Sequence, residues 1–502
     1  MMLLFCKFVI QNNFKMIVEQ LYTSCLAQGA YYIQSEGEAA VIDPLREYQP
    51  YLDLAAKNNA KIKYIFETHF HADFVSGHLD LAKNTGAEIV FGPNAHTEFK
   101  STVATDNQEF KIGKLTIKVL HTPGHTLESA TFLLLDENKK PHCIFSGDTL
   151  FIGDVGRPDL AIKSDLTQED LAGMLYNSLH NKIMTLPDDV IVYPAHGAGS
   201  ACGKNMSKET FDTLGNQKKT NYALANITKA EFIKELTTGI LPPPQYFAKN
   251  AQLNKTGYDN YDSVAQKGTK ALSVNDVKHL LDTTNTIVLD VRKPNEFATE
   301  HVTNSIFIGI DGQFAPWVGA LITDLKQAII LVAPEGREEE AVKRLSRVGY
   351  DNCVGFISGG VTAWKNAGGE TSSILSITAD EFSGKLSNNT LDVLDVRKPG
   401  EYESSHLCSV DNKPLDYITE WHDSLSKDKE YHIHCAGGYR SMIAASLLKR
   451  KGYHKLVDVA GGYGAIQKTN AKIVTTACKT EQAKTAVKPK QGFFSRLFSK
   501  KL

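Results

Sequence analysis

Residues 68–78 hold the densest group of metal-binding side chains in the sequence, Thr-His-Phe-His-Ala-Asp-Phe-Val-Ser-Gly-His. His69, His71 and Asp73 alternate directly after an apolar, strand-like run at 61–66. Alternate side chains released from the end of a strand can converge on one point without an intervening helix. Imidazole and carboxylate ligands suit zinc, iron or manganese, and no nearby cysteine suggests a structural zinc knot. This stretch therefore predicts a metal site.

Three later polar clusters also follow apolar, strand-like runs, and they contain His125, Asp148 and His196. From Met16 to about Asn205, short apolar runs alternate with turn signals and long helical patterns are few. This pattern predicts a sheet-rich α/β domain whose strand ends carry the chemistry. The more polar stretch 204–271 contains Leu-Pro-Pro-Pro at 241–244, which excludes a helix or an inner strand there. We interpret 204–271 as the end of this domain and a linker.

Length and composition predict a soluble protein of about three domains, because 502 residues exceed one core. A hydrophobic content of 42% and a charged content of 22% are ordinary, and a net charge of -2 gives no footprint for nucleic acid. Eight cysteines without a CxxC pair predict free thiols and a cytoplasmic location. The first residues show neither a signal peptide nor a membrane span, and residues 1–15 are either a start-site artefact or a disordered extension.

An internal repeat organises the second half of the chain. The block Leu-Asp-Val-Arg-Lys-Pro-Asn-Glu-Phe at 289–297 returns as Leu-Asp-Val-Arg-Lys-Pro-Gly-Glu-Tyr at 394–402, an offset of 105 residues. A histidine follows each block, and a Gly-Tyr pair and a Gly-Gly pair recur further on. Two copies of one α/β domain of roughly 100 residues therefore stand in tandem.

The second copy contains a thiol in a glycine-rich loop. An apolar strand at 431–434 is followed by Cys435-Ala-Gly437-Gly438-Tyr-Arg440-Ser, and a helical pattern begins at once. Backbone N–H groups converge at such a helix start and favour a thiolate, which is nucleophilic towards sulfane sulfur. The loop resembles the active-site loop of rhodanese, in which a catalytic cysteine opens a six-residue cradle and an arginine ends it. The alternative is a buried structural cysteine.

The first copy lacks this thiol. When Arg337 is aligned with Arg440, Val332 stands in the position of Cys435 and Glu338, Glu339 and Glu340 follow. Valine cannot carry sulfur, and the three carboxylates would repel an anion. We expect a rhodanese-like domain without sulfurtransferase activity that serves as a scaffold or a docking surface.

The order His-x-His-x-Asp, His125, Asp148, His196 resembles the metallo-β-lactamase superfamily, which implies an αβ/βα sandwich. In its dinuclear hydrolases, including the glyoxalase II type, a histidine follows the aspartate, but here that residue is Phe74. Phenylalanine has no lone pair, so this position argues for one metal. One metal with two histidines and a carboxylate suits a non-haem Fe(II) oxygenase, and zinc is the alternative.

The resemblance narrows to the persulfide dioxygenases, which implies a mononuclear iron held by His69, His125 and Asp148. His71, Asp73 and His196 would then orient the ligands or line the pocket. The Gly-Asp-Val-Gly-Arg-Pro-Asp segment at 153–159 also matches that family.

Two other residues near these motifs are candidates. Arg157 is either an anion anchor for substrate or sulfite, or half of an ion pair with a neighbouring aspartate. Cys202 lies in a stretch that resembles fusions of a persulfide dioxygenase with rhodanese domains. It either relays a persulfide near the iron or packs as a small apolar residue.

The sequence thus predicts four segments: a metallo-β-lactamase-fold dioxygenase with its linker at 16–271, a cysteine-less rhodanese-like domain at 272–370, an active rhodanese at 371–475 and a basic amphipathic tail at 476–502. The tail would contact an anionic membrane, bind a partner or remain disordered.

The resemblance implies that O2 and iron oxidise a low-molecular-weight thiol persulfide to sulfite. Cys435 would then transfer sulfur to sulfite and give thiosulfate, with Arg440, Gly437 and Gly438 in the cradle. We also expect a homo-oligomer. The alternatives are a zinc thioester hydrolase of the glyoxalase II type fused to a sulfurtransferase, and a binding protein whose repeats are docking modules or sulfur sensors.

Overall fold

The computed structural model describes residues 16–160, 166–240, 242–388 and 391–475. The N-terminal extension and the basic C-terminal tail considered above lie outside these residues. The chain divides into two compact units, Met1–Ile374 with Lys449–Lys451, and the remainder from Leu375 on. Among the described residues, no helix is long and apolar enough to span a bilayer.

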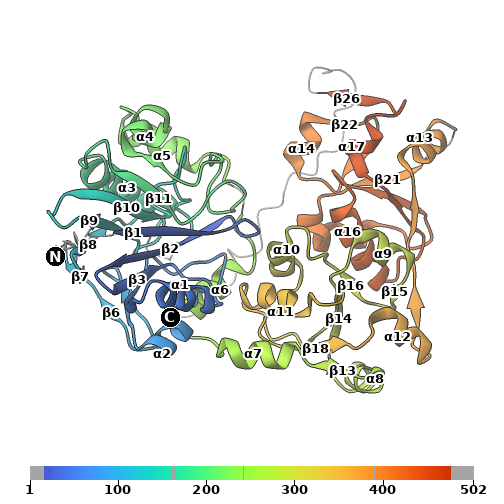
Figure 1. Ribbon diagram of the computed structural model, residues 1–502. Helices are drawn as coiled ribbons and strands as arrows, with labels where there is room; N and C mark the ends of the chain where they lie inside the picture. The colour runs from blue at the N-terminus through green and yellow to red at the C-terminus, as the bar shows by residue number, and fades with distance from the viewer. Residues whose placement is uncertain (1–15, 161–165, 241, 389–390, 476–502) are drawn as a thin grey trace, which may run out of the picture. The chain divides into compact units, whose positions relative to one another are not determined.

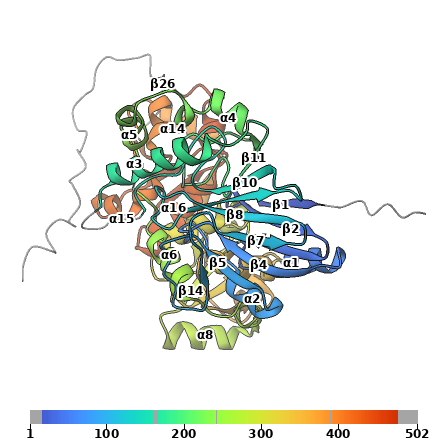
Figure 2. The ribbon, with the colours of Figure 1, turned by 90° about the vertical axis from the view of Figure 1, so that its left-hand side faces the viewer.

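Two six-stranded sheets form the N-terminal domain, as expected (Figures 1 and 2). The first sheet runs in the order β1(Ile17–Thr23), β2(Gln28–Ser35), β3(Glu38–Ile42), β4(Lys61–Glu67), β5(Glu88–Phe91), β6(Thr102–Val103). The second runs β12(Asp212–Thr213), β11(Ile191–Pro194), β10(Pro141–Gly147), β9(Ala130–Leu135), β8(Leu115–His121), β7(Glu109–Ile112). Strands β2 and β9 are buried along their whole length, because each is covered on both faces.

Three apolar clusters define the layers of this domain. The central cluster joins the inner faces of both sheets, for example Phe66 of β4 with Phe132 of β9. A second cluster packs α3(Gln168–Ser178) and α5(Lys229–Thr237) against the second sheet, and a third packs α1(Gln49–Lys57) and α2(His78–Thr85) against the first. Helix, sheet, sheet and helix follow in that order, which confirms the predicted αβ/βα sandwich (Figure 1).

The stretch 204–271, expected to hold the end of the domain and a linker, contains four α-helices in its described residues. They are α4(Leu214–Thr220), α5, α6(Phe247–Thr256) and α7(Tyr261–Gly268). Helix α5 begins at a capping box between Thr228 and Glu231 and buries Phe232 and Leu236 in the second cluster. These helices were not predicted from the sequence, because each buries only a narrow stripe of apolar side chains and the apolar content of the stretch is therefore low.

The two repeats have the same topology, as the repeated sequence predicted. The first sheet is β13(Ala271–Leu272), β18(Cys353–Ile357), β17(Ile329–Val332), β14(Ile287–Asp290), β16(Ile306–Phe307), all parallel. The second is β20(Leu375–Ile377), β25(Leu456–Val459), β24(Tyr431–His434), β21(Asp392–Asp395), β23(Asp411–Asn412), also parallel. Each has a two-stranded ribbon, β15(His301–Val302) with β19(Thr371–Ser372), and β22(Ser405–Leu407) with β26(Ile473–Thr475).

Helices surround both parallel sheets. They are α8(Val274–Thr283), α9(Pro294–Thr299), α10(Phe314–Leu321), α11(Glu338–Ser346) and α12(Gly360–Asn366) in the first copy, and α13(Ala379–Asn388), α14(Pro399–Ser404), α15(Ile418–Trp421), α16(Tyr439–Arg450) and α17(Gly462–Ile466) in the second. The pairing of β13 with β18 and of β19 with β15 assigns 271 and 371–372 to the first copy, one or two residues beyond each expected limit.

Candidate metal centre and thiol loop

Four strand ends bring the predicted metal-binding residues to one edge of the sandwich. His69 follows β4, His125 follows β8, Asp148 follows β10 and His196 follows β11. His69, His125 and Asp148 are all buried, and one ligand atom of each lies within 4.8 Å of the others. His125 Nε2 lies 3.3 Å and His69 Nε2 3.8 Å from Asp148 Oδ2.

The hydrogen bonds of both imidazoles point their Nε2 lone pairs into this cluster. His125 Nδ1 donates to the carbonyl of Arg157 at 2.8 Å, and in the neutral tautomer with this hydrogen bond the lone pair is on Nε2. His69 Nδ1 lies 3.0 Å from Thr68 Oγ1, whose own hydrogen goes to Asp43 Oδ2 at 2.9 Å. Burial, followed by the neighbouring His71, holds the pKa of His69 well below its ordinary value, so the ring is a neutral ligand.

The donor set fits a metal ion. His125 Nε2 and Asp148 Oδ2 are buried and have no hydrogen-bond partner. Buried polar atoms without partners are costly, and a cation between them would satisfy both. Two imidazoles and one carboxylate suit zinc or iron, and their ring nitrogens opposite the metal are already held by protein groups. Gly156 is required beside them, because a Cβ there would lie 2.1 Å from the Asp148 carbonyl oxygen.

His196 bridges two carboxylates next to this cluster. Its Nδ1 lies 2.8 Å from Asp148 Oδ1 and its Nε2 lies 2.8 Å from Asp73 Oδ2. Burial lowers the pKa of His196, but Asp148 and Asp73 outweigh it and raise this pKa well above its ordinary value. An imidazolium paired with two carboxylates has no lone pair for a metal, and its Nδ1 hydrogen bond orients Asp148 instead.

Cys202 joins Asp73 and His196 in a second buried group of metal-ligand type. Burial, followed by the charges of Asp73 and Asp148, raises the pKa of the Cys202 thiol well above its ordinary value. A metal at this group would have to displace protons from both His196 and Cys202. Phe74, fully buried, lies beside it with its ring centroid 6.3 Å from that of His196 and 4.3 Å from that of His71.

His71 lies in a third group, which sequence reasoning did not anticipate in full. Its Nε2 is 3.1 Å from Asp43 Oδ1 and 3.7 Å from Glu67 Oε2, and all three side chains are buried. Burial and then Asp43 raise the pKa of Glu67 well above its ordinary value. Asp43 and Glu67 each end or follow a strand directly before a loop, which is the signal that could have found them.

Arg157 forms an ion pair with Asp159, which is one of the two roles considered for it above. Its Nε and Nη2 donate to the two carboxylate oxygens of Asp159 at 2.6 and 2.7 Å, and its Nη1 donates to the Ala201 carbonyl at 3.2 Å. Its main chain accepts from His125 and donates to the Cys202 carbonyl at 2.9 Å. In this conformation Arg157 orients a metal ligand and the Cys202 loop, and its guanidinium is engaged by Asp159.

In the thiol loop of the second repeat, one backbone N–H contacts the predicted nucleophile. Cys435 directly follows β24, is buried, and its Sγ accepts the Gly438 N–H at 3.1 Å. Gly438 has φ +98°, a conformation open to glycine, and a Cβ added at Gly437 would meet no atom within 4 Å. Ser441 Oγ lies 3.7 Å from Cys435 Sγ and donates to Asp458 Oδ1 at 2.7 Å. Arg440 forms a bidentate pair with Glu401 at 2.6 and 2.8 Å.

Strand register corrects the alignment of the first repeat. Asp290 pairs with Val332 as Asp395 pairs with His434, so Ala333, rather than Val332, takes the position of Cys435. The sequence alignment failed because the loop between strand and helix is one residue longer in the first repeat, 333–337 against 435–438. Alanine cannot carry sulfur either, so the first repeat still lacks the thiol.

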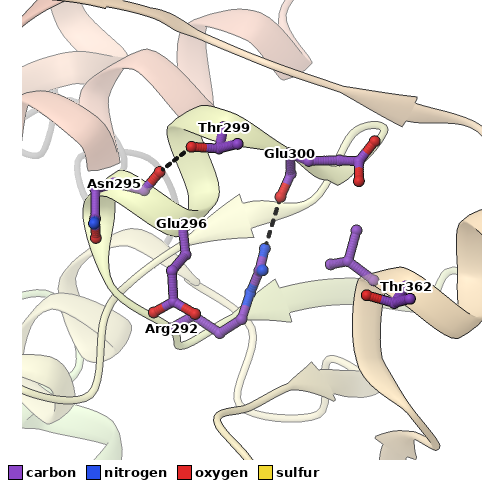
Figure 3. A pocket seen from close by; sticks show the side chains of 7 residues that line it. Arg292, Asn295, Glu296, Thr299, Glu300 and Thr362 are labelled. Carbon is purple, nitrogen blue, oxygen red and sulfur yellow. Dashed lines mark hydrogen bonds between the residues drawn. The ribbon is translucent and has the colours of Figure 1, made fainter.

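The same comparison explains a cavity of about 270 Å³ in the first repeat (Figure 3). In the second repeat, Tyr463 stacks on Arg397, with the ring centroid 3.7 Å from Cζ. The equivalent residues are Val361 and Arg292, and the smaller valine leaves the space beside Arg292 open. The backbone of Tyr463 also supports the thiol loop through the Cys435 carbonyl.

Comparison with known proteins identifies both kinds of domain. Residues 25–196 match the Metallo-beta-lactamase superfamily, and residues 273–367 and 378–469 match the Rhodanese-like domain. The "Persulfide dioxygenase ETHE1, mitochondrial" of Homo sapiens is 30% identical over 210 residues, 41% of this chain and 74% of that protein. The "Hydroxyacylglutathione hydrolase" of Dictyostelium discoideum is 35% identical over 162 residues, 32% of this chain and 57% of that protein.

A solved structure covers more of the chain. The metallo-beta-lactamase from Staphylococcus aureus subsp. aureus COL is 31% identical with a TM-score of 0.60, over 68% of this chain and 98% of that one. The family matches and the cluster of ligands identify an enzyme with a metal-binding domain. The chain therefore belongs to the metallo-β-lactamase superfamily and carries that domain ahead of two rhodanese-like domains.

Proposed function

We propose that this protein is a mononuclear iron persulfide dioxygenase joined to a rhodanese sulfurtransferase. The observation that carries the proposal is the face made by His69, His125 and Asp148, with Phe74 in place of a further ligand. A thiol in a rhodanese-like cradle on the same chain agrees with sulfur chemistry. The similarity to a persulfide dioxygenase supports the same conclusion.

Ferrous iron held by these three residues would supply redox chemistry and open positions for sulfur and dioxygen, which zinc cannot. The chain's own residues fix the geometry: Thr68 and the Arg157 carbonyl hold the outer nitrogens of the two histidines. His196 holds the second oxygen of Asp148. The buried Phe74 keeps water and a second cation from that side.

A cavity of about 440 Å³ adjoins the loops that carry the histidines and is suited to the thiol carrier. Phe70 and Ala72, which alternate with His69 and His71, line one side, and Phe247 and Lys255 of α6 line another. Among the described lining residues, Lys255 has the only positive charge, and Glu128 and Asp159 carry carboxylates. We expect a carrier with an apolar stem and an anionic group.

The overall reaction balances in three steps. A thiol persulfide, O2 and water give the thiol and sulfite, as dioxygen takes four electrons from the terminal sulfur. A second persulfide passes its terminal sulfur to Cys435, and the S–S bond to its carrier breaks as the carrier thiol leaves. Sulfite then attacks the outer sulfur on Cys435, which gives thiosulfate and returns the thiolate. The Gly438 N–H at 3.1 Å stabilises negative charge on Sγ in the last two steps.

Two measurements test this proposal. Anaerobically purified protein should contain one iron per chain and should consume O2 when glutathione persulfide is added. Cys435→Ser should still consume O2 but should release sulfite in place of thiosulfate. Unchanged thiosulfate output from this variant would refute the coupling of the two sites.

The alternative is a zinc thioester hydrolase fused to a sulfurtransferase. It is favoured by the 35% identity to a hydroxyacylglutathione hydrolase. A hydrolase would contain zinc, cleave a hydroxyacylglutathione thioester and consume no O2. The presence of Phe74, which removes one ligand of a dinuclear site, speaks against it.

A further inference from the structure

Asn254 of α6 fixes the loop that carries the metal-binding motif. We define the motif loop as residues 69–78. The Asn254 side chain is 2% exposed, and its Nδ2 donates to the carbonyls of His71 and Phe74 at 2.8 Å each. Its Oδ1 accepts the Ser76 N–H at 2.8 Å. One carboxamide therefore satisfies three buried backbone groups of the motif loop.

The cysteine-less rhodanese-like domain supplies the next contact. The Val75 N–H, between the groups that Asn254 holds, donates to the Arg347 carbonyl at 2.7 Å. Val75 is fully buried, so water cannot replace this acceptor. Arg347 directly follows α11 and is itself held by Glu47 of the metallo-β-lactamase domain, at 3.0 Å from Nε to Oε2.

A second arginine also joins these two domains, but it belongs to the metallo-β-lactamase domain and binds residues of the rhodanese-like domain. Arg46 of the metallo-β-lactamase domain is fully buried and binds both carboxylate oxygens of Asp351 at 3.2 and 2.8 Å. It also donates to the Ser346 carbonyl at 3.1 Å, and its guanidinium lies 4.3 Å from the ring centroid of Tyr258. Buried, bidentate charge pairs tolerate little displacement, so the two exchanged arginines fix the position of the Arg347 carbonyl.

We propose that the cysteine-less domain is a permanent support of the metal centre, and that Asn254 and Arg347 are positioning residues for metal binding. Both act on the backbone of 71–76, between His69 and the α2 helix, and through it on the spacing of the ligands. This role explains why a domain without its thiol remains folded against the motif loop. It goes beyond the proposed reaction, because a hydrolase would need the same support.

Cobalt(II) affinity of the full-length, metal-free protein tests this proposal without any substrate. Asn254→Ala and Arg347→Ala should each lower the affinity roughly 10–100-fold, as expected when a group that orients ligands is removed. The visible spectrum of the bound cobalt should change, because the ligand geometry relaxes. Arg344→Ala is the matched control, since Arg344 also lies on α11 but bonds Glu340 and the Ile310 carbonyl within its own domain. Its cobalt affinity and spectrum should match those of the unchanged protein.

Exchanging the charges of Arg347 and Glu47 distinguishes a role in positioning the motif loop from a general loss of folding. Arg347→Glu should weaken cobalt binding, and Glu47→Arg in the same chain should restore it, because the ion pair forms again with opposite polarity. The proposal is overturned if Asn254→Ala and Arg347→Ala bind cobalt like the unchanged protein, if Arg344→Ala weakens binding equally, or if the exchanged pair stays as weak as Arg347→Glu alone.

Discussion

Replacing Phe74 with histidine should convert the proposed one-metal centre into a two-metal centre. Phe74 lies beside Asp73 and His196, whose Oδ2 and Nε2 are 2.8 Å apart, and Cys202 completes that group. The resemblance to dinuclear hydrolases assigns a histidine to this position. An imidazole would add a lone pair where the benzene ring now packs on His71.

The magnitude follows from the burial of Phe74, which is 0% exposed. Complete truncation of a buried phenylalanine costs about 3–5 kcal/mol of folding stability. Histidine keeps a ring, so we expect Phe74→His to lose about half of that stability through packing. A buried imidazole nitrogen without a partner adds about 1–3 kcal/mol. The metal-free Phe74→His protein should therefore be about 3–5 kcal/mol less stable, which lowers its melting temperature by roughly 6–20 °C. A metal at about 1,000 times its Kd would return about 4 kcal/mol.

Elemental analysis and calorimetry check both numbers. Phe74→His should bind two equivalents of zinc, and zinc should restore most of the lost melting temperature. Phe74→Leu is the control, because leucine also changes the packing but offers no lone pair, and it should bind one equivalent. Two equivalents in the unchanged protein, or one in Phe74→His, would refute the reasoning that Phe74 limits the site to one metal.

Three further predictions concern other parts of the chain. Burial raises the pKa of Asp458 to about 6, against the hydrogen bonds of Ser441 and Ser376. Since the folded pKa exceeds the unfolded value, this group stabilises the fold fully below about pH 4, and about 3 kcal/mol of that stability is lost as the pH rises through 6. Calorimetry should find Asp458→Asn more stable relative to the unchanged protein at pH 7.5 than at pH 4; an equal difference at both would contradict this. Lys255→Met should raise the KM for glutathione persulfide about fivefold, because the loss of a partly exposed ion pair costs about 1 kcal/mol. The KM for an uncharged alkyl persulfide should not change. Equal changes in KM for the two substrates would exclude Lys255 as the contact of the anionic group. Gly156→Ala should lower the metal content measured by elemental analysis, because its Cβ would displace the Asp148 carbonyl or His125. The control Gly400→Ala should have the metal content of the unchanged protein, because a Cβ there meets no atom within 4 Å.

Strand patterns made most of the fold predictable. The runs that end at Phe66, Leu120 and Phe145 are largely buried, and the run that ends at Tyr193 alternates buried with half-buried residues. Short apolar runs of this kind are typical of strands. The repeat at 289–297 and 394–402 predicted two domains of one topology, which the identical strand orders confirm. The helices α4 to α7 were not predicted, because their narrow apolar stripes are diluted by polar residues.

For the metal centre, the residue types in the sequence indicated the ligands, but the sequence did not show that these residues lie close together in space. Local order places His69, His125 and Asp148 at strand ends, but only the pairing of strands brings these ends within reach of one another. Asp43 and Glu67 were missed because an acidic residue beside a strand is common and becomes notable only once it is buried next to His71. The thiol of Cys435 was found because loop and helix start are adjacent in sequence.

The sequence by itself determined the kinds of domain, the absence of a thiol in the first repeat and the presence of Phe74, which has no lone pair, directly after Asp73. These features depend only on which atoms a side chain has. Only the tertiary structure decided that Ala333 corresponds to Cys435, that Arg157 is bound by Asp159, and that Asn254 and Arg347 hold the motif loop. Apart from the local pair of Arg157 and Asp159, these facts depend on strand register and on contacts between residues far apart in the chain, such as Arg46 and Asp351, which are 305 positions apart. Such contacts leave no periodic or local signal in the sequence.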